Sequence, residues 1–335
     1  MTSGELSVSL SGVKSSVRFP PADSPRIAST PVVLVLVLAI LGLSISGPMV
    51  RLSRAEPLAI AVWRMGLASA IVAPFVAHSR AWREWRTLTR GDLALAIGAG
   101  AMLALHLWTW IASVAMTSVA ASVVLVDMHP VIVALGSAVW LKERPARMQV
   151  VGLVIAMVGA GVIAAGDATG GAGSSAVGAS SAAGRGAVVG DALAAAGALT
   201  VAIYYLVGRR LRRKLGLWAY VGLVYAACLA CLLVIAVATG TRLGSQPPRE
   251  LAIFAAIAAG PMMLGHTGMN WALRHVPAYV VSIVMLGEPV GATLIAALLP
   301  AIAEVPSAAT VAGGAVILAG ILLASRSSVA TASPD

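Results

Sequence analysis

The chain has 335 residues, of which 59% are hydrophobic and 11% charged, and its mean hydropathy is +0.93. A soluble domain is nearer half apolar and a quarter charged, so the composition excludes a soluble protein and predicts an integral membrane protein. The net charge of +10 would indicate nucleic-acid binding in a soluble chain. Here the basic residues lie in short segments between apolar runs, where they set membrane orientation instead.

The first 29 residues are polar and include Lys14, Arg18 and Arg26. The apolar run that follows is too long for a signal-peptide core and has no clear cleavage site. We therefore expect a cytoplasmic tail at 1–29 followed by a retained membrane helix. A second polar tail occupies 327–335.

Ten apolar runs are long enough to cross the hydrocarbon core, which takes about 20 residues of helix. Most connections are short, which predicts that consecutive helices are antiparallel neighbours. The exception is 167–187, whose Gly, Ser and Ala content is typical of a flexible linker. It lacks the G-x-x-x-x-G-K-[ST] pattern of a phosphate-binding loop. The predicted spans are 31–50, 57–77, 92–113, 118–140, 147–166, 188–208, 217–238, 251–272, 278–299 and 307–325.

The basic residues predict an orientation. With the N-terminus placed inside, 17 of the 23 Lys and Arg residues fall on cytoplasmic segments and five on external ones, while Arg64 lies within a helix. This asymmetry favours both termini in the cytoplasm. The preference for Arg over Lys is typical of a GC-rich bacterial genome, so we expect a bacterial inner membrane.

The two halves of the chain, 30–166 and 188–326, carry the same landmarks in the same order. Because each copy holds five helices, an odd number, the second copy must enter the membrane from the opposite side. The sequence therefore predicts an all-α polytopic membrane protein with ten transmembrane helices in an inverted five-plus-five repeat. The matched pairs are Gly100 and Gly260, His106 and His266, and Ala112 and Ala272 at an offset of 160, Pro130 and Pro289 at 159, and Pro145, Gly152 and Gly159 with Pro306, Gly313 and Gly320 at 161.

Several stretches carry a resemblance to a known family. They are Val62-Trp63-Arg64, TSVAASVVL (117–125) with WLKERP (140–145), NWALRHVPA (270–278), LGEPVGATLIAALL (286–299) and GGAVILAGILLA (313–324). This ordered set resembles the ten-helix EamA-type transporters of the drug/metabolite transporter (DMT) superfamily. The resemblance implies a carrier of small metabolites, often amino acids and commonly exported, and no enzyme activity. One departure is Ile302-Ala303-Glu304-Val305-Pro306, in which the expected acid, Glu304, is displaced.

Two proline-centred stretches place ionisable residues deep in apolar runs. They are Asp127-Met128-His129-Pro130 and Leu286-Gly287-Glu288-Pro289. Charge at that depth is costly and commonly functional, and Pro130 and Pro289 should each break a helix.

His129 and Glu288 are repeat mates, so we expect facing repeats to bring them near the pseudo-axis. There they would bind an ammonium group or carry a proton, or else form a structural ion pair. Asp127 would cap the broken helix or face the same cavity.

Two further polar pairs lie in the predicted third and eighth helices. Trp110 follows His106, and Asn270 follows His266, by one turn each, so each pair shares a helix face. The four residues would line a polar, aromatic pocket, or form hydrogen bonds between helices. Arg64 in the second helix would fix a substrate carboxylate, or extend to the outer membrane interface.

We predict a transporter that moves a small polar metabolite by alternating access, with an amino acid or related compound favoured as an export substrate. Its partners would be that substrate and the lipid bilayer, with no cofactor or nucleic acid, and a homodimer stays open. A divalent metal-ion or cationic drug carrier is the alternative, since His and acidic residues are metal ligands. A membrane-embedded enzyme is less favoured because no G-x-S-x-G or H-E-x-x-H motif is present.

Overall fold

The computed structural model describes residues 30–116, 122, 125–169, 181–298 and 308–326. Within these ranges every regular element is a helix. The two predicted tails, much of the predicted linker and Glu304 lie outside the described residues. The elements are α1 (Thr30–Ser44), α2 (Ser46–Leu52), α3 (Pro57–His78), η1 (Ala81–Thr87), α4 (Arg90–Met116), α6 (His129–Gly136), η2 (Ser137–Leu141), α7 (Arg147–Thr169), α8 (Ser181–Arg212), α9 (Leu217–Thr239), α10 (Pro248–Ile257), η3 (Ala258–Thr267), α11 (Gly268–Ala272), α12 (Ala278–Met285), α13 (Glu288–Leu298) and α14 (Ala308–Arg326).

Among the described residues, seven helices are long and apolar enough to cross a membrane. They coincide with seven of the ten predicted spans. At the other three positions the described residues contain shorter apolar segments, at His129–Leu141, Arg147–Ile163 and Ala278–Ala292. Membrane-spanning helices are therefore confirmed, whereas the count of ten is not. The seven are Thr30–Leu52, Pro57–His78, Arg90–Met116, Val188–Arg212, Leu217–Thr239, Pro248–Ala272 and Ala308–Arg326.

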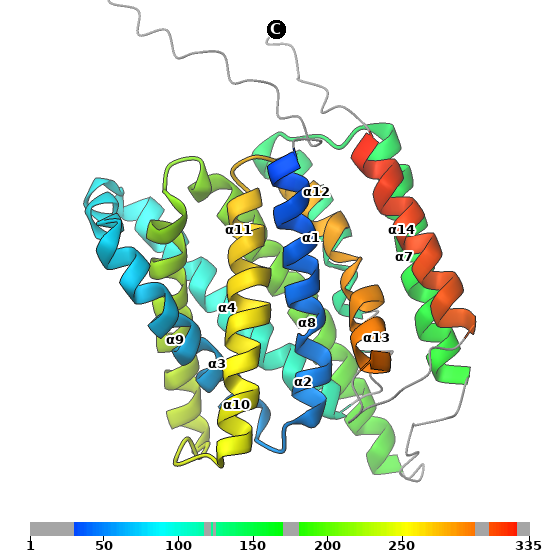
Figure 1. Cartoon of the computed structure of the whole chain (residues 1–335), viewed down its shortest axis with the longest axis horizontal. Coiled ribbons are helices and arrows are strands. Elements are labelled where there is room, and N and C mark those ends of the chain that lie inside the picture. Colours follow the sequence, from blue (N-terminus) through cyan, green and yellow to red (C-terminus); the bar gives the residue numbers. More distant parts are fainter. Residues whose placement is uncertain (1–29, 117–121, 123–124, 170–180, 299–307, 327–335) are drawn as a thin grey trace, which may run out of the picture.

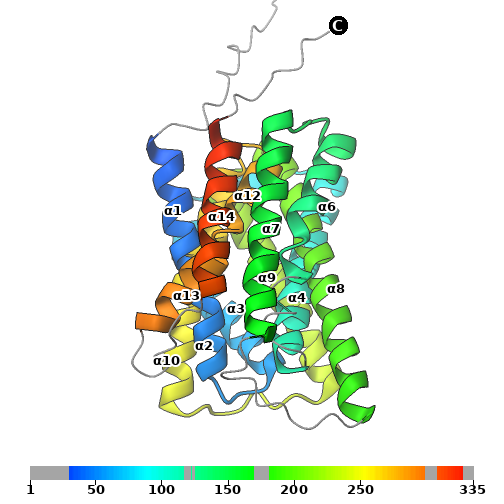
Figure 2. The ribbon, with the colours of Figure 1, turned by 90° about the vertical axis from the view of Figure 1, so that its right-hand side faces the viewer.

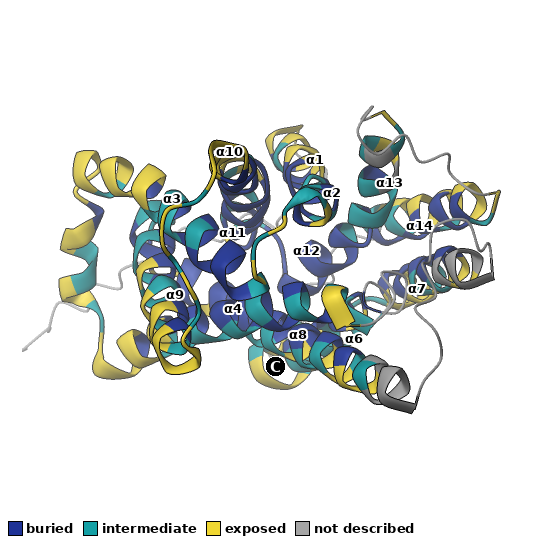
Figure 3. Cartoon of the chain, turned by 90° about the horizontal axis from the view of Figure 1, so that it is seen from below, coloured by how far each residue is buried: buried dark blue, intermediate teal, exposed yellow. Residues whose placement is uncertain are grey.

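The helices stand side by side in one bundle, with α7 and α14 at one edge and α3 and α9 toward the other (Figure 1; Figure 2). The start of α1 and the end of α14 lie at the same end, which we call the terminal end (Figure 1). Seen along the bundle, buried residues face its interior and exposed residues its outside (Figure 3). The exposed residues include many large apolar side chains, such as Val154, Val158 and Leu322, as expected where lipid replaces water.

The helices of the two halves pack on each other reciprocally. The long helix α4 of the first half packs against α8 and α9, the first helices of the second half. The helix formed by α10, η3 and α11 packs in turn against α1 and α3, the first helices of the first half. The third long helix of each half therefore packs against the first two long helices of the other half.

The α7–α14 contact is made by glycines. A Cβ atom on Gly152 would lie 2.6 Å from the carbonyl oxygen of Gly320, and one on Gly159 would lie 2.7 Å from that of Gly313. Glycine lets membrane helices approach this closely. The two helices run antiparallel, since 152 meets 320 and 159 meets 313. Gly152 thus contacts Gly320, the repeat mate of Gly159, and Gly159 contacts Gly313, the repeat mate of Gly152. A two-fold axis between the repeats requires this reciprocal pairing.

Gly159→Leu is expected to disrupt this contact. The side chain has no room against the α14 backbone, and overpacking costs about 1–3 kcal/mol, or roughly 5 °C in melting temperature. Gly161→Leu on the same helix is the control, because a Cβ there meets nothing within 4 Å. Thermal unfolding followed by size-exclusion chromatography measures both, and equal melting temperatures would contradict the packing.

Candidate functional site

Buried polar side chains from both halves gather inside the bundle. Arg64 on α3, His106 on α4, His129 on α6 and His266 on η3 are each less than a tenth exposed, and Asn270 on α11 is fully buried. Such groups are costly in an apolar interior unless they have partners. Their surroundings therefore decide whether they serve structure or ligand binding.

The structure brings His106 and His266 together. Their ring centroids are 6.3 Å apart, with the planes at 66°. Nδ1 of His106 lies 3.0 Å from the carbonyl oxygen of Gly197 on α8. A carbonyl only accepts, so His106 donates from Nδ1 and presents Nε2 as an acceptor. Nδ1 of His266 has no hydrogen-bond partner within the described residues. The pair thus offers ring nitrogens that a ligand can use.

Two adjacent tyrosines on α8 extend this cluster, and sequence reasoning missed them. The Tyr204 ring lies 6.1 Å from that of His266 and 4.9 Å from that of Tyr205. Asn270 donates from Nδ2 to the Tyr204 hydroxyl at 2.5 Å. Tyr205 is fully buried, and no described residue hydrogen-bonds its hydroxyl. Both lie near the end of the predicted span 188–208, where membrane tyrosines commonly mark the interface, so their position gave no distinctive signal.

Arg64 is 1% exposed, so it lies in the interior and does not reach the membrane interface. Its Nη1 donates to the Ser46 hydroxyl at a long 3.3 Å, and its Nε has no partner in the described part of the chain. The carboxyl of Glu288 and the hydroxyl of Tyr225 are close enough to stabilise its charge. Tyr225 is the residue that loosely matches Arg64 in the second repeat.

Glu288 begins α13 and, unlike Arg64, is partly exposed. Its carboxyl lies within electrostatic range of Arg64 and Asp127. Among the described residues, however, the ion pairs within 4.0 Å include neither Glu288 nor Arg64. The cation and the anion therefore attract each other without being in contact.

The structure does not join His129 to Glu288 directly. The His129 ring lies 6.5 Å from that of Tyr205, and Tyr205 is in turn within electrostatic range of Glu288. His129 donates from Nδ1 to the carbonyl of Val126 at 3.0 Å, which leaves Nε2 without a partner among the described side chains. Asp127 lies in the preceding turn, 7% exposed. Tyr205 is thus a common neighbour of the two predicted repeat mates.

A helix break lies at each of the two prolines. Pro130 falls in the first turn of α6, after a turn at Asp127 and Met128. Likewise α12 ends at Met285 and α13 starts one residue before Pro289. The Ser44 hydroxyl donates to the backbone carbonyl of Glu288 at 3.2 Å, which links the start of α13 to the end of α1. The breaks set His129 and Glu288 at helix starts near the middle of the bundle.

Trp110 is half-buried and packs against the apolar core, and within the described residues no ring contact joins it to His106. The aromatic side chains beside the histidines are therefore those of α8. The part of the chain that the structure describes holds no group of three His, Cys, Asp or Glu residues able to bind a metal ion.

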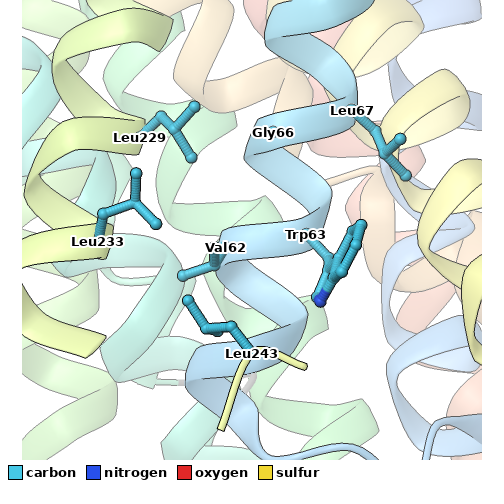
Figure 4. A pocket seen from close by; sticks show the side chains of 7 residues that line it. All are labelled: Val62, Trp63, Gly66, Leu67, Leu229, Leu233 and Leu243. Atoms are coloured by element: carbon cyan, nitrogen blue, oxygen red, sulfur yellow. The ribbon is translucent and has the colours of Figure 1, made fainter. Parts of the chain in front are cut away.

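Two cavities lie beside α3, away from the polar cluster. The first, of about 340 Å³, lies between α3 and α9, and we call it the α3–α9 cavity (Figure 4). The second, of about 350 Å³, lies at the start of α3 and we call it the entrance cavity. The α3–α9 cavity is lined by Val62, Trp63, Gly66, Leu67, Leu229, Leu233 and Leu243, and the entrance cavity by Glu56, Pro57, Leu58, Trp108, Ala112, Thr239 and Thr241.

Matching polar contacts join the two halves at the two ends of the bundle. At the terminal end, Lys214 in the α8–α9 loop binds the Asp92 carboxylate at 2.8 Å. At the opposite end, the Ser53 hydroxyl in the α2–α3 loop donates to Glu250 at 2.5 Å. Asp92 and Glu250 are each the third residue of their helix, α4 and α10. At the terminal end, Glu143 also pairs with Arg209 at 2.8 Å and with Arg213.

Residues 30–165 and 188–326, one segment in each half, match the EamA-like transporter family. The chain belongs to this family. Membership makes it a multi-pass membrane protein and a transporter of the DMT superfamily, and the family is one of transporters, not of enzymes. The two matched segments correspond to the two copies of the repeated unit.

The chain is also similar in fold to solved structures. No protein of curated function matches the chain. Among solved structures, 29 chains are similar. One, a crystal structure of another protein, superposes with a TM-score of 0.70 over 89% of this chain and 97% of that chain, at 19% identity. At this identity the likeness shows the fold alone.

Proposed function

We propose that this EamA-like protein transports a small zwitterionic metabolite, an amino acid or a related compound, and exports it. The observation that carries the proposal is the separation of Arg64 from Glu288. Arg64 is a buried guanidinium with an unpartnered Nε, and Glu288 is a partly exposed carboxyl, close to it but not in contact. A zwitterion would pair with both groups, with its carboxylate at Arg64 and its ammonium at Glu288.

The surrounding side chains suit a polar substrate of modest size. Tyr205, His129 and His266 each present a polar atom that has no hydrogen-bond partner among the described residues. Their rings and that of Tyr204 line the same region. An unpaired polar atom in an apolar interior costs free energy, so a substrate that hydrogen-bonds here recovers that cost on binding. Asp127 would contribute a second carboxyl on the ammonium side.

We infer an inverted repeat of five and five helices for this protein. Three observations support it: the reciprocal packing of α4 and α10–η3–α11, the antiparallel glycine contact of α7 with α14, and the meeting of the repeat mates His106 and His266. Carriers built this way place their substrate near the axis that relates the repeats. The meeting of the repeat mates His106 and His266 supports an axis that passes close to this pair.

Alternating access follows from the same arrangement. The Asp92–Lys214 contact at the terminal end and the Glu250–Ser53 contact at the opposite end each join one half to the other. Rocking of the halves about the central site would break one contact and keep the other. The excess of basic residues supports a cytoplasmic position for the terminal end, and the preference for Arg over Lys supports a bacterial cell.

Purified protein in liposomes tests the substrate class. Liposomes loaded with radiolabelled amino acids, sugars, nucleosides or divalent cations are followed for efflux, and we expect efflux of one or more amino acids. Efflux of divalent cations alone, or of none of the amino acids, would refute the proposal.

Glu288→Gln is expected to lower efflux of the active amino acid about 10- to 100-fold, since it removes the charge that faces the substrate ammonium. Asp23→Asn, in the polar N-terminal segment, is the matched control and should transport normally. Normal efflux by Glu288→Gln would remove Glu288 from the site.

A further inference from the structure

The α3–α9 cavity faces outward from the bundle and has an apolar lining. Four of its residues are leucines, and Leu233 is 39% exposed. Trp63 supplies the polar atom, an Nε1 that no described residue hydrogen-bonds. The ring of Trp63 stacks on Phe254 at 6.2 Å, which holds that wall in place. In a membrane-spanning region, a cavity of this lining is accessible to hydrocarbon and excludes polar solutes.

The entrance cavity lies beside the α3–α9 cavity, toward the end of the bundle opposite the terminal end, since Thr241 lines one and Leu243 the other. It uses the first residues of α3 and the last of α9, and it is partly polar, with Glu56, Thr239 and Thr241 in its lining. The two threonine hydroxyls lie 2.9 Å apart. Trp108 also lines it, and tryptophan is typical of the membrane–water interface. The partly polar entrance cavity, which we call the mouth, therefore adjoins an apolar slot.

The length of this combined space matches one leaflet. Its lining on α3 runs from Glu56 to Leu67, which at 1.5 Å per residue is about 15 Å. The hydrocarbon core of a bilayer is about 30 Å thick, so the space extends over about half of it. An acyl chain from the leaflet at the α2–α3 end has this reach.

Charges at the mouth complement a zwitterionic head group. Arg242 is exposed and directly precedes Leu243, which lines the α3–α9 cavity. Glu56 is also exposed and lines the entrance cavity. Among the described residues, neither side chain forms an ion pair. A guanidinium suits a phosphate and a carboxylate suits an ammonium.

We propose that these two cavities form a binding site for one membrane glycerophospholipid. An acyl chain occupies the α3–α9 cavity against Leu229 and Leu233, and the phosphate and amine of the head group meet Arg242 and Glu56. Val62 and Trp63 of the cavity wall directly precede Arg64, whose side chain is buried on the interior side. The bound lipid therefore packs against the helix that carries the central cation, and this holds whatever substrate the protein transports.

Photo-crosslinking tests the site. The full-length protein is placed in nanodiscs that contain a phosphatidylethanolamine with a diazirine on its acyl chain, and labelled peptides are mapped by mass spectrometry. We expect labelling of 62–67 and 229–243 above that of the lipid-facing helix α7. Gly66→Leu should lower this labelling about fivefold or more, because a Cβ there meets nothing within 4 Å and the leucine fills the cavity.

Matched variants separate a lipid site from general contact with the bilayer. Gly98→Leu on α4 also enters open space, outside these cavities, and should label like the wild type. Arg242→Gln should lower labelling about two- to fivefold with the phospholipid but not with a diazirine fatty acid, which has no phosphate. Unchanged labelling in Gly66→Leu, or labelling no higher than that of α7, would overturn the proposal. So would loss of labelling on addition of the transported amino acid, because the cavity would then belong to the transport route.

Discussion

Arg64→Gln is expected to lower transport about 100-fold or more while leaving the protein at least as stable as the wild type. In the proposed site the guanidinium makes two charge-assisted hydrogen bonds to a substrate carboxylate, each worth about 1.5–3 kcal/mol. Every 1.36 kcal/mol is a factor of ten, so the loss of both gives this range. Arg64→Lys keeps the positive charge but loses the two-pronged hydrogen bonding of the guanidinium, and it should retain part of the transport activity.

Arg64→Gln is expected to keep the stability of the wild type because the Arg64 guanidinium has few hydrogen-bond partners. It has one long hydrogen bond, to Ser46, and an unpartnered Nε in the described structure. Burying a charge in an apolar interior costs desolvation free energy, and the hydrogen bonds of Arg64 offset little of that cost. Its removal should therefore leave the melting temperature unchanged or raise it, whereas a residue retained for structure would lower it.

Arg212 is the matched control because it is as deeply buried but fully engaged. It is 1% exposed, donates from Nε to the carbonyl of Asn270 at 2.9 Å, and donates from Nη1 to that of Leu215 at 2.5 Å. Arg212→Gln should lower the melting temperature by several degrees, since it leaves those carbonyls unpaired. Liposome efflux and thermal unfolding measure both variants. A lower melting temperature in Arg64→Gln with normal efflux would assign Arg64 a structural role.

Glycine, proline and histidine landmarks predicted much of the fold because each imposes a local constraint. Gly152 and Gly159 repeat as Gly313 and Gly320, and the structure packs these glycines against each other in the reciprocal order that the repeat implies. His106 and His266, paired by the same offset, face each other. Residues that contact their own repeat mates, or the mates of their neighbours, can therefore be paired from a single sequence.

The neighbours of the remaining site residues could not be predicted, because they depend on how each helix is rotated and where it breaks. His129 matches Glu288 in the alignment, yet its ring lies beside Tyr205. Tyrosine in a membrane sequence is as readily an interface anchor as a site residue, so Tyr204 and Tyr205 gave no distinctive signal. The turns before Pro130 and Pro289 also divide the helices at those positions, and the residues on either side of each turn then depend on the packing of two shorter helices.

The contacts at the two ends of the bundle should respond in opposite directions to mutation. Asp92→Asn removes the charge that holds Lys214 at 2.8 Å, and Glu250→Gln removes the charge that accepts from Ser53 and from Arg249. Each acid is almost fully buried, so its loss is expected to cost about 1–3 kcal/mol of the contact between the halves. Each variant should therefore open its own end.

Hydrogen–deuterium exchange in nanodiscs measures this opening. Asp92→Asn should raise deuterium uptake in the α8–α9 loop (213–216) and Glu250→Gln in the α2–α3 loop (53–56). If the halves rock as rigid units about the central site, opening one end closes the other. Each variant should then lower uptake at the end that was not mutated.

The decrease at the distant end is the decisive measurement, because local fraying cannot produce it. Loss of one acid loosens its own loop in any structure, whereas protection at the opposite end requires that the two ends share one equilibrium. A bias of about 1–3 kcal/mol shifts such an equilibrium roughly 5- to 150-fold, enough to be measured and enough to slow transport in both variants. Asp23→Asn, which neutralises an acid of the polar N-terminal segment, should change neither end. Increased uptake confined to the mutated end would show that the contacts stabilise their loops independently, and alternating access by rocking would then lose its structural support.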